Sequence, residues 1–432
     1  VPGDRRDGVA AVRVRRGAVR LLAPRMSEPA ALRQAAGSVG AALAVVDLKH
    51  VDLVRDAGLE RVLVLGGGAK RRTVDAGVVD MEAIDVTRAP LPAGLELDAG
   101  RAHELGCILL RPTDAGGLRA VPVTHHRWAL SALGAAAACT LTPDDTVYGC
   151  IPLHHPAGLL VSVGAALAAG SRLALAEQFD EERFFPEVRR YGATVVFYAG
   201  EMLRPLMSRT PSPADRTHPV RIFAGSGMRK TLWRGLSERY GVSVLEFYAS
   251  TSHRLILANA SGAKVGALGR VMPGSEEPIV VRCDLGSRMP VYDADGCVER
   301  AAVGEAGILA ARTPPAEATG DEVRLRGGDL LFLTGDVVKR DAQGDHWFID
   351  ALSGHVEIEG RIVSLRAIED AYYALPEIHQ VAAIARDGRV EVLYAPRAAT
   401  LRRRRAASRA SLAAIPLACP RRRASSTRRG SR

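Results

Sequence analysis

The chain has 432 residues, 47% of them hydrophobic, and a formal net charge of +10. That length is enough for two domains with sizeable cores. The positive charge is a property of the chain's end: residues 401–432 contain 11 Arg and no acid, and subtracting these from +10 leaves −1. The body of the chain therefore gives no electrostatic reason to expect nucleic-acid binding.

Cysteine usage and hydropathy exclude further classes. The six cysteines are scattered without a CxxC pair, which favours buried thiols in a reducing compartment over a metal or redox centre. No long apolar segment of a signal peptide is seen near residue 1. The longest uncharged apolar run, residues 156–171, is shorter than the ~20 residues that span a bilayer, so it predicts a buried helix. A cytoplasmic location follows.

Helical and strand patterns alternate along the chain after an irregular, Arg-rich start at residues 1–25. Strand patterns occur at residues 41–47, 61–68, 146–153, 172–177, 193–200 and 242–248. Helical patterns occur before the first of these strands and at residues 51–59, 158–171, 180–191, 201–207 and 231–240. This alternation predicts an α/β fold with largely parallel sheets.

The character of the sequence changes after residue 270. Short β-like pieces at residues 271–330 and a hairpin pattern at 332–350 predict a small β-subdomain. Residues 369–396 read as a helix and two strands. We therefore expect a large domain over residues 26–349 and a partial α+β domain over 350–398. The Arg-rich segment 399–432 is of low complexity and predicts a disordered tail.

The most specific motif lies in residues 223–270. Gly225 and Gly227 supply a tight turn before a helix, and the strand "VSVLEFY" ends in the turn "ASTS", at the edge where open α/β sheets bind ligands. The stretch resembles the segment "GNGLRPDIW…EFYGATEGN…GxxGR" of adenylate-forming enzymes of the fatty-acid-transport-protein, very-long-chain acyl-CoA synthetase type. The matching residues are Gly225, Gly227, Trp233, Glu246, Phe247, Tyr248, Thr251, Gly266, Gly269 and Arg270.

Two further motifs carry the same resemblance. In "PLHHPAG", His155 matches a histidine that in relatives lines the junction of the acyl and nucleotide sites. In "FLTGDVVKRDAQGDHWFID", Asp336 matches the aspartate that binds both ribose hydroxyls of ATP, a task that suits a two-oxygen acceptor. The resemblance thus implies catalytic roles for His155 and Thr251. It implies nucleotide binding by Gly225, Gly227, Tyr248, Thr251 and Asp336. Purely structural roles also fit these motifs: His155 as a loop histidine, and residues 332–350 as a simple hairpin.

Several positions depart from the family pattern. Ser252 stands where the family has its metal-binding glutamate, so we assign no metal ligand. Pro112 and Asp114 fall in the region of the phosphate loop, where a missing N–H and a negative charge oppose phosphate binding. The family pattern also predicts a missing front part of about a hundred residues. No lysine follows Lys339, which predicts that the family's C-terminal catalytic lysine is absent.

The resemblance implies ATP, Mg²⁺ and CoA as cofactors and a fatty acid or other carboxylic acid as substrate. One function is a fatty acid–CoA ligase that acts through acyl-AMP. The alternative is a catalytically impaired or inactive homologue that binds only nucleotide or acyl chains. Peripheral membrane contact is an additional expectation. A scaffold that acts through its basic tail is a third hypothesis, supported by the tail alone.

Overall fold

The computed structural model describes residues 19–21, 28–65, 74, 77–85, 87–88, 101–112, 118–249, 255–260, 262–358, 360–375, 377–386 and 389–396. These residues divide into two compact units. One comprises the chain up to Cys283 together with Pro290–Phe348, and the other comprises Asp284–Met289 with the chain from Ile349 onward. Within the described residues, no helix is both long and apolar enough to cross a membrane.

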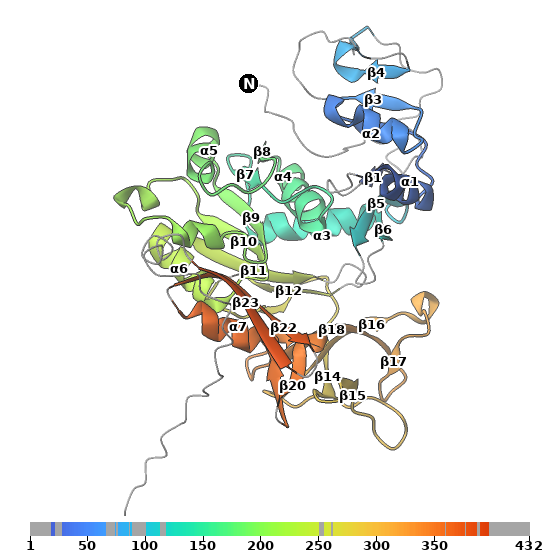
Figure 1. Ribbon diagram of the computed structural model, residues 1–432. Coiled ribbons are helices and arrows are strands. Elements are labelled where there is room, and N and C mark those ends of the chain that lie inside the picture. The colour runs from blue at the N-terminus through green and yellow to red at the C-terminus, as the bar shows by residue number, and fades with distance from the viewer. Residues whose placement is uncertain are drawn as a thin grey trace, which may run out of the picture. The chain divides into compact units, whose positions relative to one another are not determined.

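The largest sheet of the described chain has seven strands (Figure 1). Its order is β13 (Arg270–Val271), β12 (Ile256–Asn259), β11 (Ser243–Ala249), β10 (Ile222–Ser226), β9 (Val195–Ala199), β7 (Thr146–Gly149) and β8 (Arg172–Leu175). Several residues of the candidate site lie in or next to its strands β10 and β11. The strands from β11 to β8 run parallel, and β12 and β13 are antiparallel. The parallel sheet predicted from the alternating pattern is therefore confirmed, and the carboxyl ends of β9, β10 and β11 share one edge.

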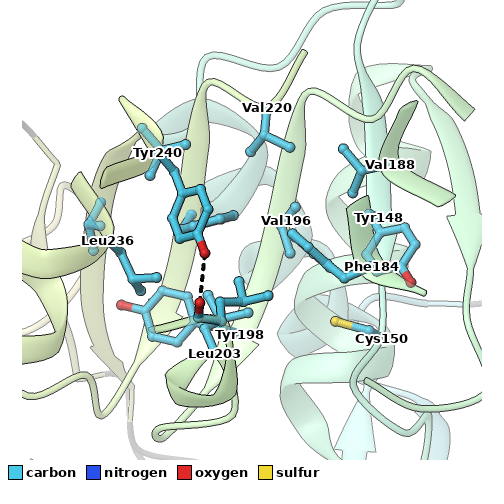
Figure 2. Close-up of a cluster of buried hydrophobic side chains, with 14 of the residues drawn as sticks. Tyr148, Cys150, Phe184, Val188, Val196, Tyr198, Leu203, Val220, Leu236 and Tyr240 are labelled. Carbon is cyan, nitrogen blue, oxygen red and sulfur yellow. Dashed lines mark hydrogen bonds between the residues drawn. The ribbon is translucent and has the colours of Figure 1, made fainter. Parts of the chain in front are cut away.

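Helices α5 (Phe184–Tyr191) and α6 (Lys230–Tyr240) cover one face of this sheet. Strand side chains alternate between the two faces, so only every second residue of a strand meets these helices. Figure 2 shows part of the resulting core, which includes Tyr148, Phe184, Val196, Tyr198, Leu236 and Tyr240. The apolar residues of α6 that the helical spacing singles out are all buried, and Gly241 ends the helix in the left-handed conformation.

Helix α3 (His125–Ala138), a π-helix at Ala157–Val163 and α4 (Gly164–Ala169) cover the opposite face. The apolar run at residues 156–171 is thus helical over 157–169, as the sequence predicts; the face toward the sheet is buried, and Leu167 on the other face is 71% exposed. Gly164 lets α3 and α4 approach closely, since a Cβ there would lie 2.9 Å from the Ala132 Cβ and 3.0 Å from Trp128 Nε1. Helices on both faces complete the α/β layers.

The remaining elements form smaller sheets. Near the start of the described chain are β1 (Val19–Leu21), β5 (Leu105–Pro112) and β6 (Leu118–Thr124) in one sheet, and β2 (Ala44–Val46), β3 (Val62–Val64) and β4 (Val78–Asp80) in another, with α1 (Pro29–Ser38) and α2 (Val51–Asp56). A β-sheet follows the order β15 (Met289–Pro290), β14 (Ile279–Asp284), β16 (Ala306–Thr313), β18 (Leu330–Arg340) and β17 (Val323–Arg324), with β19 (His346–Ala351) paired to β18. The last elements are β20 (His355–Ile358), β21 (Arg361–Ser364), α7 (Leu365–Tyr373), β22 (Ile378–Arg386) and β23 (Arg389–Pro396).

Two predicted helices differ from the structure. Residues 201–207 form a turn and a short 3-10 helix, Arg204–Ser208, instead of an α-helix. Pro205 explains this, since it lacks the N–H that an α-helix requires beyond its first turn. The helix predicted over 180–191 begins at Phe184, and the Asp180 carboxylate accepts the N–H groups of Glu182 and Arg183 at 2.9 and 3.1 Å in the turn that leads into it.

Candidate functional site

The turn that follows β10 packs closely against β9. Gly225 is buried, and a Cβ at this position would lie 2.2 Å from the backbone oxygen of Tyr198. Gly227 has a φ of +94°, and a Cβ there would lie 3.0 Å from the Cα of Gly200. A side chain at Gly225, which lies within β10, or at Gly227, which lies in the turn after it, would force the backbone there to move. The tip of the turn at Gly227 is exposed, so a ligand can approach its backbone.

Glu246 anchors this turn from the neighbouring strand β11, where it lies opposite Gly225. Its side chain is only 3% exposed. One carboxylate oxygen, Oε1, accepts the backbone N–H groups of Gly227 and Met228, the latter at 3.2 Å. The other, Oε2, accepts the hydroxyl of Tyr198. A buried carboxylate is costly unless it is hydrogen-bonded, and here three donors satisfy it.

The sequence places Glu246 in the motif but does not predict its partners. A single acidic residue within the apolar strand "VSVLEFY" is the available signal, because buried charges are nearly always paired or hydrogen-bonded. Nothing in the sequence points to Tyr198, which comes from β9 on the far side of β10. Burial and the nearby Glu246 carboxylate raise the pKa of Tyr198 well above its ordinary value, so its hydroxyl stays a donor.

Tyr248 connects this sheet to β18. Its hydroxyl donates to Oδ2 of Asp336 at 2.7 Å. Asp336 follows Gly335, whose φ is +81°, and the Asp336 N–H donates to Thr334 Oγ1 at 3.2 Å. Burial first, and then the Asp336 carboxylate, raise the pKa of Tyr248 well above its usual range. The tyrosine is therefore a neutral donor that orients the carboxylate of Asp336.

A cluster of charges fixes the hairpin between β18 and β19. Lys264 donates to Oδ2 of Asp341 at 2.7 Å and to Oδ2 of Asp345 at 2.6 Å. Arg270 donates to the same oxygen of Asp345 at 3.3 Å. Burial acts to raise the pKa of Asp341, but the hydrogen bonds from Lys264 and Trp347 outweigh it and hold the pKa well below its usual range. The cluster thus secures the hairpin that continues from the strand of Asp336.

Gly225 and Gly227 contact Glu246 of β11, and Tyr248, two residues further along that strand, bonds Asp336 of β18. His155 is seen instead at the start of the π-helix, where its Nδ1 accepts the N–H of Ala157 at 3.1 Å. This bond fits a structural role for His155 in its loop. A contact between His155 and a substrate stays a prediction.

The segments expected near phosphates lie outside the described residues. These are residues 113–117 and the turn with Thr251 and Ser252. Within the residues that the structure does describe, no group of three or more His, Cys, Asp and Glu side chains could hold a metal ion. Two hollows of about 100 and 310 Å³ lie beside α5 and are lined mostly by charged side chains. Gly227, Tyr248 and Asp336 line neither of them.

Comparisons with known proteins point to the same segment. Residues 116–314 match the family described as AMP-binding enzyme. The medium/long-chain-fatty-acid–CoA ligase FadD6 of Mycobacterium tuberculosis is 32% identical over 322 residues, which are 70% of this chain and 53% of that protein. The chain carries an AMP-binding enzyme domain. The long-chain fatty acid transport protein 5 of Mus musculus is a further relative, 30% identical over 309 residues, 68% of this chain and 44% of that protein.

Solved structures show the same fold. ATP-bound MatB from Rhodopseudomonas palustris superposes with a TM-score of 0.65 and 21% identity, over 84% of this chain and 69% of that chain. MenE from Bacillus subtilis, in complex with ATP and magnesium, superposes with a TM-score of 0.63 and 17% identity, over 87% of this chain and 74% of that chain. At these identities the likeness concerns the fold alone, and it confirms the predicted α/β fold.

The AMP-binding domain contains Gly225, Gly227 and Tyr248, and Asp336 follows the matched segment. The chain spans about half the length of the curated relatives it matches.

Proposed function

We propose that this chain is an acyl-CoA synthetase-like protein that activates fatty acids or related carboxylic acids with ATP. In the first step a carboxylate oxygen of the acid attacks the α-phosphorus of ATP, and pyrophosphate leaves with its bonding electrons. In the second step the thiolate of CoA attacks the acyl carbon and AMP leaves. The observation that carries this proposal is the bond between Tyr248 and Asp336, which brings together the two motifs that the resemblance assigns to ATP.

The described residues suit the nucleoside part of ATP. Asp336 is half-buried, and its two carboxylate oxygens can accept the two ribose hydroxyls as charge-assisted hydrogen bonds. Tyr248 holds the carboxylate in place from the neighbouring sheet. The exposed turn at Gly227 allows the close approach of a ligand to backbone, which a larger side chain would block.

Mg²⁺ and CoA belong to the proposal by resemblance. A magnesium ion would neutralise charge on the phosphates in the first step. Among the described residues no group of three or more His, Cys, Asp and Glu side chains could hold the ion, so no ligand is assigned to it. The proposed substrate is a fatty acid, and a cytoplasmic location with peripheral membrane contact accompanies it.

The test is calorimetric titration of the full chain with ATP and Mg²⁺, followed by a pyrophosphate-release screen over carboxylic acids of increasing chain length. Asp336→Asn should weaken ATP binding by about ten- to a hundredfold, because it removes a charged acceptor of two hydrogen bonds. Asp329→Asn is the matched control, since Asp329 is an exposed carboxylate next to the same strand and pairs with Arg312 at 2.9 Å.

The outcomes separate the two functions left open by the sequence. ATP binding that Asp336→Asn weakens and Asp329→Asn keeps, together with pyrophosphate release, supports the ligase. The same binding without pyrophosphate release for any acid would identify a nucleotide-binding homologue that lacks ligase activity. Absence of binding at millimolar ATP would overturn both.

A further inference from the structure

Two side chains from different strands meet at the turn that follows β10. β10 lies between β9 and β11, with Gly225 paired to Tyr198 on one side and to Glu246 on the other. Gly225 has no side chain, and the Tyr198 ring occupies the space that a Cβ would need: its nearest ring carbons would lie 2.7 Å away. The Tyr198 hydroxyl then donates to Glu246, so the two side chains form a bracket, Tyr198–Glu246, around the end of β10.

The bracket is more than part of the apolar core. Both residues are almost completely buried, and Tyr198 belongs to a cluster of buried hydrophobic side chains. An apolar residue at position 246 would avoid the cost of burying a carboxylate. The carboxylate instead binds the backbone of the turn, because Glu246 accepts the N–H groups of Gly227 and Met228. Hydrogen bonds to a charged acceptor are stronger than those to a neutral one.

The direction of these bonds limits what the turn can bind. The N–H groups of Gly227 and Met228 point to Glu246, so they do not form the cradle of amides that a phosphate requires. The carboxylate also places negative charge directly beneath the turn. Glu246 therefore holds the turn in one conformation. Tyr248 lies two residues beyond Glu246 along β11, and its hydroxyl bonds Asp336 of β18.

We propose that Tyr198 and Glu246 are positioning residues, which hold the turn at Gly227 and Met228 in the conformation that accepts the nucleoside of ATP. This inference rests on the proposed function. The chain supplies a matched control in Tyr148, which lies in the same buried core and donates to Glu187 at 2.6 Å, away from the turn. Tyr198→Phe and Tyr148→Phe thus each remove one buried tyrosine hydroxyl from the same core.

The experiment measures two quantities on the full chain for wild type, Tyr198→Phe, Glu246→Gln and Tyr148→Phe. The first is amide hydrogen exchange in peptides that cover residues 225–229, which needs no ligand. The second is the Kd for ATP with Mg²⁺. We expect faster exchange of the turn in both bracket variants and a Kd raised by about tenfold in Glu246→Gln, with a smaller rise in Tyr198→Phe. Tyr148→Phe should leave both quantities at the wild-type level.

The outcomes distinguish this inference from the function on which it rests. A wild-type chain that binds no ATP would overturn both. Wild-type binding with Tyr198→Phe equal to Tyr148→Phe in exchange and in Kd would overturn the bracket alone and leave the function intact. Since a buried Gln can prevent folding, Tyr198→Phe decides the case wherever Glu246→Gln is not recovered as folded protein.

Discussion

Asp145 ties together three strands at the edge of the large sheet opposite the candidate site. It directly precedes β7 and is 7% exposed. Its Oδ1 accepts the hydroxyl of Thr194, next to β9, at 2.6 Å, and its Oδ2 accepts Arg221 Nη2, next to β10, at 3.1 Å. Arg221 also donates to the backbone oxygen of Cys139 at the end of α3, at 2.8 Å. We predict that Asp145→Asn destabilises the fold and leaves nucleotide affinity unchanged.

The pKa of Asp145 gives the magnitude. Burial by itself raises the pKa, but the hydrogen bonds from Arg221 and Thr194 outweigh burial and lower it from 3.8 to about 2. Because the folded-state pKa lies below the unfolded one, this stabilisation is complete above about pH 4 and is lost as the pH falls through about 2. The difference between the two values corresponds to about 2 kcal/mol of unfolding free energy at neutral pH, and to roughly half of that at about pH 3.

The assay is urea unfolding followed by the fluorescence of Trp128, Trp233 and Trp347, at neutral pH and at about pH 3. The difference in unfolding free energy between wild type and Asp145→Asn should be about 2 kcal/mol at neutral pH and shrink in acid. Asp144→Asn is the control, since Asp144 is the exposed neighbouring residue. A difference that stays the same at both pH values, or an equal loss in Asp144→Asn, would refute the reasoning.

Three further predictions concern the site and the core. Gly225→Ala should destabilise the chain by about 3 kcal/mol or more, because its Cβ would lie 2.2 Å from the Tyr198 backbone oxygen; an unfolding midpoint equal to that of wild type would contradict the packing described. Tyr248→Phe should weaken ATP binding by about tenfold through loss of the bond to Asp336, and titration calorimetry checks this; unchanged affinity would show that the hydroxyl does not orient the carboxylate. Leu236→Ala removes a completely buried side chain of α6 and should cost about 2–5 kcal/mol in urea unfolding, whereas a cost below about 1 kcal/mol would mean that the helix is loosely packed.

Much of the fold was predictable because it depends on short-range patterns. Alternating helical and strand periodicities predicted the α/β layers, and the spacing of Leu232, Trp233, Leu236 and Tyr240 predicted the buried face of α6. Local chemistry also decided the exceptions: Pro205 limits residues 204–208 to a 3-10 helix. The motifs identified Gly225, Gly227, Tyr248 and Asp336 as candidates.

The sequence by itself determined most of the elements, their order and the match of residues 116–314 to AMP-binding enzymes, since these depend on residue types at fixed local spacing. Only the tertiary structure showed which side chains meet: Tyr198 with Glu246 around β10, Tyr248 with Asp336 between two sheets, and Asp145 with Arg221 at the opposite edge. These partners are separated by dozens of residues along the chain. Periodicity carries no information about such pairs, because strand order and register are set by how the whole sheet packs.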